Sequence, residues 1–383
     1  MLYFDHAASS PPYPEVIQSV ASVMERLYAN PSSLHRMGQE AEQLLRRARS
    51  VVADTLGVED REIIFTSGGT ESNNLAIKGA AIQYRQRGNH IITTMIEHPS
   101  VYETCRQLEE FGFEVTYLFP DREGRVHPEQ VKESLREDTI LVSVMHVNNE
   151  IGSIQPIREI GHILAEHPKV LFHVDAVQSL GKLELDPRDC RVDLFSGSAH
   201  KFRGPRGAGL LYCRKGLKLA PLLTGGGQEA GLRSGTEAVA LISGMAKAIR
   251  MAAEKREAET LHLRRLRSRL TAALRSIEGI VLTGPEDGAH MIPNIVHFCV
   301  PGLRTEILVH MLEEQEIYVS TQSACSSGEN KPSRVLSAMG LPEDWTRSGV
   351  RISLSGEHTE ADMDTLAEAV KASLAKLKRE SKV

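Results

Sequence analysis

Residues 192–207 read VDLFSGSAHKFRGPRG and pass from an apolar strand through small residues to Lys201, after which a Gly-Pro pair breaks the chain. A lysine in this position lies at the end of a sheet strand, which is where open α/β sheets bind their ligands. Most lysines are solvated surface charges. A lysine held at a strand end can instead form a Schiff base with an aldehyde cofactor.

Short apolar runs alternate with helix-like segments on both sides of this strand, from about residue 40 to residue 255. Near-continuous apolar strands between helices indicate a mainly parallel sheet that is covered on both faces. The expected strands are residues 62–66, 90–95, 113–118, 139–145, 170–174, 192–195 and 209–213. The sequence therefore predicts an α/β fold with a seven-stranded sheet.

A densely charged helical stretch over residues 237–278 carries the chain out of this sheet. The remaining pattern is mixed, with strands expected at 294–299, 318–320 and 350–354 and helices at 305–314 and 360–378. We expect a large α/β domain over residues 15–255 and a smaller α+β domain formed by residues 1–14 and 256–383.

Composition narrows the function classes. The 383 residues carry 45 Lys and Arg against 50 Asp and Glu, so no basic footprint for nucleic acid is present. No apolar run reaches the roughly 20 residues of a membrane span, and the N-terminus lacks a signal-peptide pattern. The five cysteines form no CxxC pair, so neither a disulfide framework nor a cysteine-based metal site is indicated. We expect a cytoplasmic protein with reduced thiols that contacts neither membranes nor nucleic acid directly.

Two further segments carry chemistry. The strand in FHVDAVQ (172–178) ends at Asp175, 26 residues before Lys201, so the two residues fit neighbouring strand ends. Asp175 is either a helix N-cap or the partner of a protonated ring nitrogen. The segment TSGGTESN (66–73) runs from a strand through glycines into a helix, which is the pattern of a phosphate cradle.

An aldehyde-binding lysine, a carboxylate for a pyridine nitrogen and a phosphate cradle together point to pyridoxal 5′-phosphate. The ordered segments then resemble the cysteine desulfurases of the class V branch of fold-type I pyridoxal phosphate enzymes. The resemblance rests on residues 5–8 (DHAA), 30–35 (NPSSLH), 66–73, 97–98 (EH), 148–152 (NNEIG), 173–178, 198–207 and 233–236 (RSGT).

This resemblance implies a role for each matching residue. Lys201 would bind the cofactor aldehyde, Asp175 its pyridine nitrogen and Gln178 its phenolic oxygen, while His98 would stack on its ring. Asn148 and Arg351 would hold the substrate, with Arg351 gripping its carboxylate. The phosphate would be held by Gly69, Thr70, Ser198 and His200, with Thr236 reaching in from the second subunit of a homodimer.

Cys325 decides which reaction the resemblance implies. It lies in a small, polar, glycine-containing loop, and its SACSS sequence (323–327) resembles the active-site loop of group I cysteine desulfurases. The residues that follow are more similar to the nitrogenase-associated type than to the housekeeping iron–sulfur type. By resemblance, Cys325 would take the sulfur of L-cysteine as a persulfide and leave alanine, with His98 as a proton acceptor.

Other readings stay open at this point. An aminotransferase or a racemase-like epimerase needs no loop cysteine, whereas a selenocysteine lyase would use the same residues. A non-catalytic scaffold that binds a sulfur carrier would not need Lys201, Asp175 and Cys325 together. The acceptor protein is also open: an iron–sulfur scaffold, a tRNA-thiolation enzyme or an enzyme of the thiamine pathway.

Overall fold

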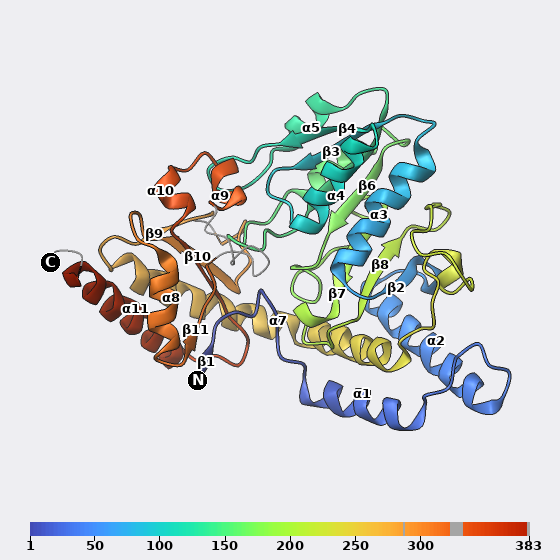
Figure 1. Ribbon diagram of the computed structural model, residues 1–383, viewed down its shortest axis with the longest axis horizontal. Coiled ribbons are helices and arrows are strands. Elements are labelled where there is room, and N and C mark those ends of the chain that lie inside the picture. The colour runs from blue at the N-terminus through green and yellow to red at the C-terminus, as the bar shows by residue number, and fades with distance from the viewer. Residues whose placement is uncertain (286–287, 322–331, 381–383) are drawn as a thin grey trace.

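The largest element of the fold is a seven-stranded sheet, seen in a computed structural model that describes residues 1–285, 288–321 and 332–380 (Figure 1). Its order is β2-β8-β7-β6-β5-β3-β4, and β8 runs antiparallel to both neighbours. The expected mainly parallel α/β fold is thereby confirmed. The strands are β2 (Ile63–Thr66), β3 (His90–Thr94), β4 (Glu114–Leu118), β5 (Thr139–Met145), β6 (Leu171–Asp175), β7 (Leu194–Ser198) and β8 (Gly209–Cys213).

Both faces of the sheet are buried, because successive strand residues alternate between two apolar cores. In β3, for example, Ile91 belongs to one core and Ile92 to the other. The Ile91 face is covered by α3 (Gly69–Tyr84) and α4 (Pro99–Glu110). The Ile92 face is covered by α1 (Pro14–Arg26), α2 (Arg36–Leu56), α5 (Pro128–Ser134), α6 (Ile157–Leu164) and the first half of α7 (Val239–Arg275).

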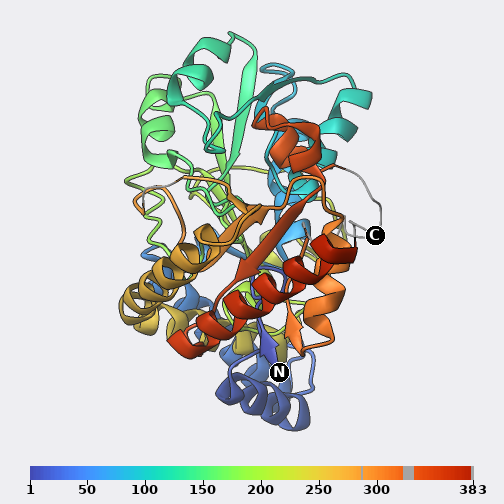
Figure 2. The same cartoon turned by 90° about the vertical axis from the view of Figure 1, so that its left-hand side faces the viewer.

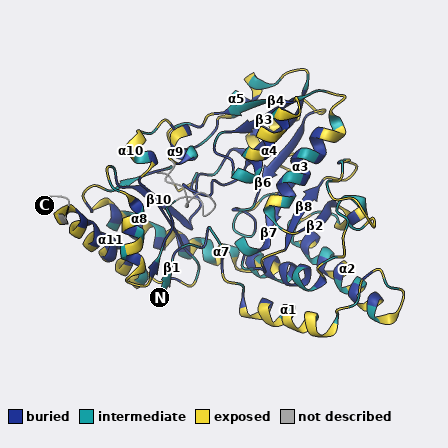
Figure 3. Ribbon diagram, viewed as in Figure 1, coloured by how far each residue is buried: buried dark blue, intermediate teal, exposed yellow. Residues whose placement is uncertain are grey.

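The outermost helix of this layer is α1, which buries Val16 and leaves most of its other residues exposed (Figure 3).

A second core lies in the C-terminal part of the chain. There β12 (Gly349–Ser353), β10 (Ile295–Cys299) and β9 (Val281–Leu282) form an antiparallel sheet. β1 (Leu2–Tyr3) pairs in parallel with β11 (Ile317–Tyr318), which brings the N-terminus to this part of the molecule. Figure 2 shows α8 (Thr305–Glu313) beside α11 (Glu360–Glu380), and both pack on this core.

The long helix α7 joins the two parts. Its residues from Ile242 to Ala252 pack in the core of the large sheet, whereas those from Leu263 to Leu274 pack in the C-terminal core. The division into residues 15–255 and 1–14 with 256–383 stays a prediction, and residue 255 lies inside this continuous helix. No helix in the described part of the chain is both long and apolar enough to cross a membrane.

Candidate active site

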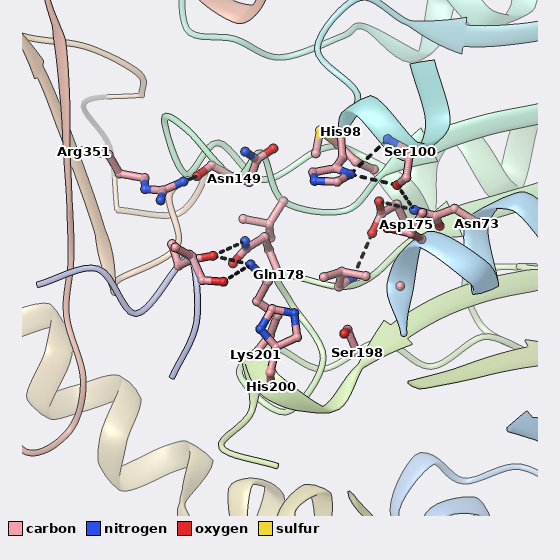
Figure 4. Close-up of a pocket in the computed structure, with 17 residues that line it drawn as sticks. Asn73, His98, Ser100, Asn149, Asp175, Gln178, Ser198, His200, Lys201 and Arg351 are labelled. Carbon is pink, nitrogen blue, oxygen red and sulfur yellow. Dashed lines mark hydrogen bonds between the residues drawn. The ribbon is translucent and has the colours of Figure 1, made fainter. Parts of the chain in front are cut away.

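A cavity of about 190 Å³ opens at the carboxyl edge of the large sheet (Figure 4). Its walls come from the turns after β2, β3, β5, β6 and β7, from the N-terminal segment and from β12. The structure brings together nine residues that the sequence had singled out: Gly69, Thr70, His98, Asp175, Gln178, Ser198, His200, Lys201 and Arg351.

Asp175 and Lys201 lie at the ends of neighbouring strands, as their spacing predicted. Asp175 ends β6, and β6 pairs in parallel with β7 with Asp175 opposite Ser196. Lys201 ends the short helical turn that follows β7. Its Nζ donates hydrogen bonds to the carbonyls of Ala7 and Ala8, the latter at 2.8 Å. The amine is thus oriented by the N-terminal segment.

A helix N-terminus and two side chains form one end of the cavity. Gly69 and Thr70 open the 16-residue helix α3, and Ser198 and His200 stand opposite. Burial and the charge of Lys201 lower the pKa of His200 to about 4, so its ring is neutral at neutral pH. The first backbone N–H groups of a helix attract an anion, and the neutral ring adds a further hydrogen-bonding group.

Gly209 is needed for this geometry. A Cβ atom on Gly209 would lie 2.5 Å from the Cα of Gly68, the N-cap of α3. Only glycine therefore lets β8 begin directly against the turn that presents the helix N-terminus.

A chain of hydrogen bonds connects Asp175 with His98. Asn73 Nδ2 donates to Asp175 Oδ2 at 2.8 Å and to Ser100 Oγ at 2.9 Å. Ser100 Oγ lies 2.8 Å from His98 Nδ1, and the Ser100 backbone N–H donates to the same nitrogen at 3.1 Å. Asn73 and Ser100 were not among the predicted site residues, although Asn73 closes the quoted glycine-rich segment.

These contacts fix the proton of the His98 ring. Because Nδ1 accepts from a backbone N–H, the network assigns the hydrogen of the neutral ring to Nε2. Burial lowers the pKa of His98. The charges of Lys201 and Arg334 lower it further, whereas the charge of Asp175 opposes this shift. The neutral ring therefore presents a donor to the cavity, and the proton-acceptor role that the resemblance implies for His98 stays a prediction.

Arg351 is held at the other end of the cavity. Its side chain is 1% exposed, and its Nη2 donates to Asp5 Oδ1 while Nη1 donates to the carbonyl of Asn149, both at 2.8 Å. Its buried Nε has no hydrogen-bond partner among the described residues. A planar guanidinium with unused donors at a cavity wall is suited to bind a carboxylate.

The asparagine that lines the cavity is Asn149, not the expected Asn148. Asn148 is fully buried, its Oδ1 accepts from the N–H groups of Glu150 and Ile151, and its Nδ2 donates to Ile96. The Asn148 side chain stabilises the turn to which it belongs and does not line the cavity. The sequence reads Asn-Asn at 148–149, so composition alone does not tell the turn-forming residue from the cavity residue.

Of the other two expected residues, the structure describes one. Thr236 is exposed and does not line the cavity. Cys325 lies outside the described residues. The four cysteines within them, Cys105, Cys190, Cys213 and Cys299, are all buried. Burial raises the pKa of each of these thiols, which keeps them protonated and unreactive.

The cavity suits a group with an aldehyde, a basic ring nitrogen and a phosphate. It offers the Lys201 amine, the Asp175 carboxylate and the N-terminus of α3 at separate points of one wall. Gln178 Nε2 donates one hydrogen bond to the carbonyl of Ala7 at 2.9 Å, and its second hydrogen can bond to a ligand. The buried Gln178 Oε1 has no partner among the described residues, so a bound polar group would satisfy it.

Comparisons with known proteins show the family to which the chain belongs. The family model described as aminotransferase class-V matches residues 2–366. A NifS/IcsS protein homolog of Lactobacillus delbrueckii subsp. bulgaricus is 48% identical over 367 residues, which cover 95% of this chain and 94% of that protein. A cysteine desulfurase IscS of Dictyoglomus turgidum is 42% identical over 378 residues, which cover 98% and 95%.

A solved structure has the same fold over nearly the whole chain. A structure described as a NifS-like protein superposes with a TM-score of 0.92 and 38% sequence identity. The match covers 98% of this chain and 99% of that one.

Proposed function

This chain belongs to the aminotransferase class-V family and is a cysteine desulfurase, and from this premise we propose that it uses pyridoxal 5′-phosphate, Lys201 and Cys325 to take sulfur from L-cysteine. The observation that carries the proposal is the meeting of Lys201, Asp175 and the N-terminus of α3 in one cavity. Pyridoxal 5′-phosphate is a cofactor that uses an amine for its aldehyde, a carboxylate for its ring nitrogen and an anion cradle for its phosphate.

Pyridoxal phosphate supplies an aldehyde that condenses with amines and a protonated ring that withdraws electrons from the adjacent carbon. Asp175 holds the proton on the ring nitrogen, and Asn73 fixes the orientation of its carboxylate. His98 covers the ring, and Gln178 donates to its phenolic oxygen. Gly69, Thr70, Ser198 and His200 hold the phosphate, and Thr236 completes the phosphate site of a second copy in a homodimer.

The substrate is oriented by Arg351, which binds the carboxylate of L-cysteine, and by Asn149 beside it. The Lys201 amine, which the Ala7 and Ala8 carbonyls hold at the cavity wall, would serve as the base for the proton on the substrate Cα. His98 donates from Nε2 to the substrate side of the cavity. The Asn73–Ser100 chain keeps that hydrogen in place.

Cys325 completes the reaction. Its thiolate forms a bond to the substrate sulfur while the carbon–sulfur bond breaks, and the electron pair stays on the carbon skeleton, which is protonated to L-alanine. The resulting persulfide passes to the thiol of an acceptor protein by exchange. The acceptor is an iron–sulfur scaffold or a thiolation enzyme. A selenocysteine lyase is the second candidate, because selenocysteine fits the same residues, and relative rates on the two substrates decide between them.

Two substitutions test the proposal together. Lys201→Ala should abolish the visible absorption band of the purified protein, since no other amine is held at that point. Cys325→Ser should keep the band and its response to L-cysteine but form no persulfide and essentially no alanine. Cys213→Ala, a buried thiol in β8, is the matched control and should stay active. Sustained alanine release by Cys325→Ser with a thiol reductant present would show that the reaction or the cysteine is wrong.

A further inference from the structure

Arg334 reaches from the C-terminal part of the chain to the turn that carries His98. It opens the short helix α9 (Arg334–Ala338), yet its guanidinium lies against the β3–α4 turn of the large sheet. Nη1 donates to the carbonyl of Met95, and Nη2 donates to the carbonyl of Glu97 at 2.5 Å. The guanidinium carbon lies 4.1 Å from the centre of the Tyr102 ring, on α4.

The segment around Arg334 is anchored to the same region by other contacts. Ser333 Oγ donates to Glu150 Oε2 at 2.6 Å, and both residues are buried. Val335 and Leu336 pack in one apolar cluster with Ile96, the central residue of the turn. Arg334 therefore sits in a well-defined interface between the two parts of the molecule.

The chemistry of this contact requires an arginine. Burial lowers the pKa of Arg334, and the nearby carboxyl groups of Glu150 and Glu97 oppose that effect, as do Tyr102 and Glu103. Among the described residues it forms no ion pair. Its direct acceptors are two carbonyls and an aromatic face. A planar fork bonds two carbonyls at once, whereas the single ammonium of lysine does not reproduce that geometry.

The second carbonyl links Arg334 to His98. The carbonyl of Glu97 and the N–H of His98 belong to one rigid peptide plane, so a hydrogen bond to the carbonyl fixes the backbone of His98. The ring of His98 is held at its far side by Ser100. The residue is thus held at both ends, by Arg334 through its backbone and by Ser100 through Nδ1.

We propose that Arg334 is a positioning residue that sets the placement of His98 over the cofactor; this rests on the role proposed for His98 above. Arg334 does not touch the cavity. It acts through the Met95–His98 turn, so its effect belongs to the turnover step and to the environment of the cofactor ring rather than to substrate capture.

The test is a double-mutant cycle on the holoenzyme with Arg334→Lys and His98→Asn. Asparagine removes the ring but keeps a helix N-cap acceptor for α4. Arg347→Lys is the control, an exposed arginine near the same interface that pairs with Glu343. The readouts are kcat, KM and the visible circular dichroism of the bound cofactor, which reports how the ring is seated independently of turnover.

We expect Arg334→Lys to lower kcat about tenfold, with KM within about twofold, and to change the dichroism band. In the His98→Asn background, Arg334→Lys should change neither kcat nor the dichroism band by more than about twofold. Arg334→Gln should repeat this pattern.

Equal effects in both backgrounds, or an Arg334→Lys enzyme that matches the Arg347→Lys control, would overturn the inference while leaving His98 in its role. A His98→Asn enzyme with unchanged kcat and dichroism would instead overturn the role of His98 itself. Loss of the fold in both Arg334 variants would also overturn the inference, because it would make Arg334 a determinant of stability.

Discussion

Replacing Asp5 by asparagine should destabilise the protein, and a carboxylate ligand should reverse part of the loss. Arg351 is 1% exposed and has one carboxylate partner among the described residues, Asp5, at 2.8 Å. Asparagine keeps an oxygen acceptor at the same place but removes the charge, so the buried guanidinium loses its counter-charge. Breaking a fully buried pair costs about 3–5 kcal/mol. Because the Asp5 side chain is 20% exposed and asparagine still accepts, we expect about 2 kcal/mol.

The measurement is thermal unfolding followed by calorimetry. An unfolding entropy of about 2.1 cal/mol/K per residue predicts a Tm lower by roughly 2–3 °C for a chain of this length. Glu42→Gln is the control, since its pair with Arg46 has a similar length but is exposed on α2 and is worth at most about 0.5 kcal/mol.

Saturating L-alanine, whose carboxylate can neutralise Arg351, should narrow the gap between Asp5→Asn and the native protein. An unchanged Tm without ligand, or a gap that widens with L-alanine, would refute the reasoning that Asp5 supplies the counter-charge of the buried Arg351.

Three further outcomes are expected. Burial and the charge of Asp175 raise the pKa of the Glu97 carboxyl to about 8, above its value in the unfolded chain. The protonated Glu97 therefore stabilises the fold fully below about pH 4.5, and this contribution is lost as the pH rises to 8. Glu97→Gln should therefore gain stability relative to the native protein between pH 5 and pH 8 in chemical unfolding, and a parallel pH dependence would contradict this. Asp175→Asn should bind the cofactor but lose most of its activity, because the ring proton is no longer stabilised by a charge; near-native kcat would exclude its role. The active protein should sediment as a dimer, and a fully active monomer would remove Thr236 from the phosphate site.

The sequence predicted the strands of the large sheet to within about three residues, for a physical reason. Strands buried on both faces are largely apolar, so Asp175 stands out as the charged end of β6, and Lys201 as a charge three residues beyond the end of β7. An apolar run does not show whether a strand is parallel or antiparallel to its neighbours. The antiparallel orientation of β8 is therefore seen only in its pairing with β2 and β7.

Side-chain roles within turns were harder to predict. Asn148 and Asn149 are identical in type, and only the hydrogen bonds of the folded turn assign the first to the backbone and the second to the cavity. The proton position on His98 depends on Ser100 and Asn73, whose contacts cross between α4 and α3. Arg334 is remote in sequence from the turn it binds. Such contacts depend on tertiary packing, which local sequence patterns do not encode.

The pairing of β1 with β11 has a consequence for synthesis on the ribosome. Leu2 and Tyr3 leave the ribosome long before their partners Ile317 and Tyr318. Until then the N-terminal segment has no strand to join, so the segment whose Ala7 and Ala8 carbonyls orient Lys201 lacks one of its anchors. The large sheet can assemble during translation, since its strands lie between residues 63 and 213. Translation products interrupted before residue 317 should therefore bury the core of the large sheet but lack the β1–β11 pair.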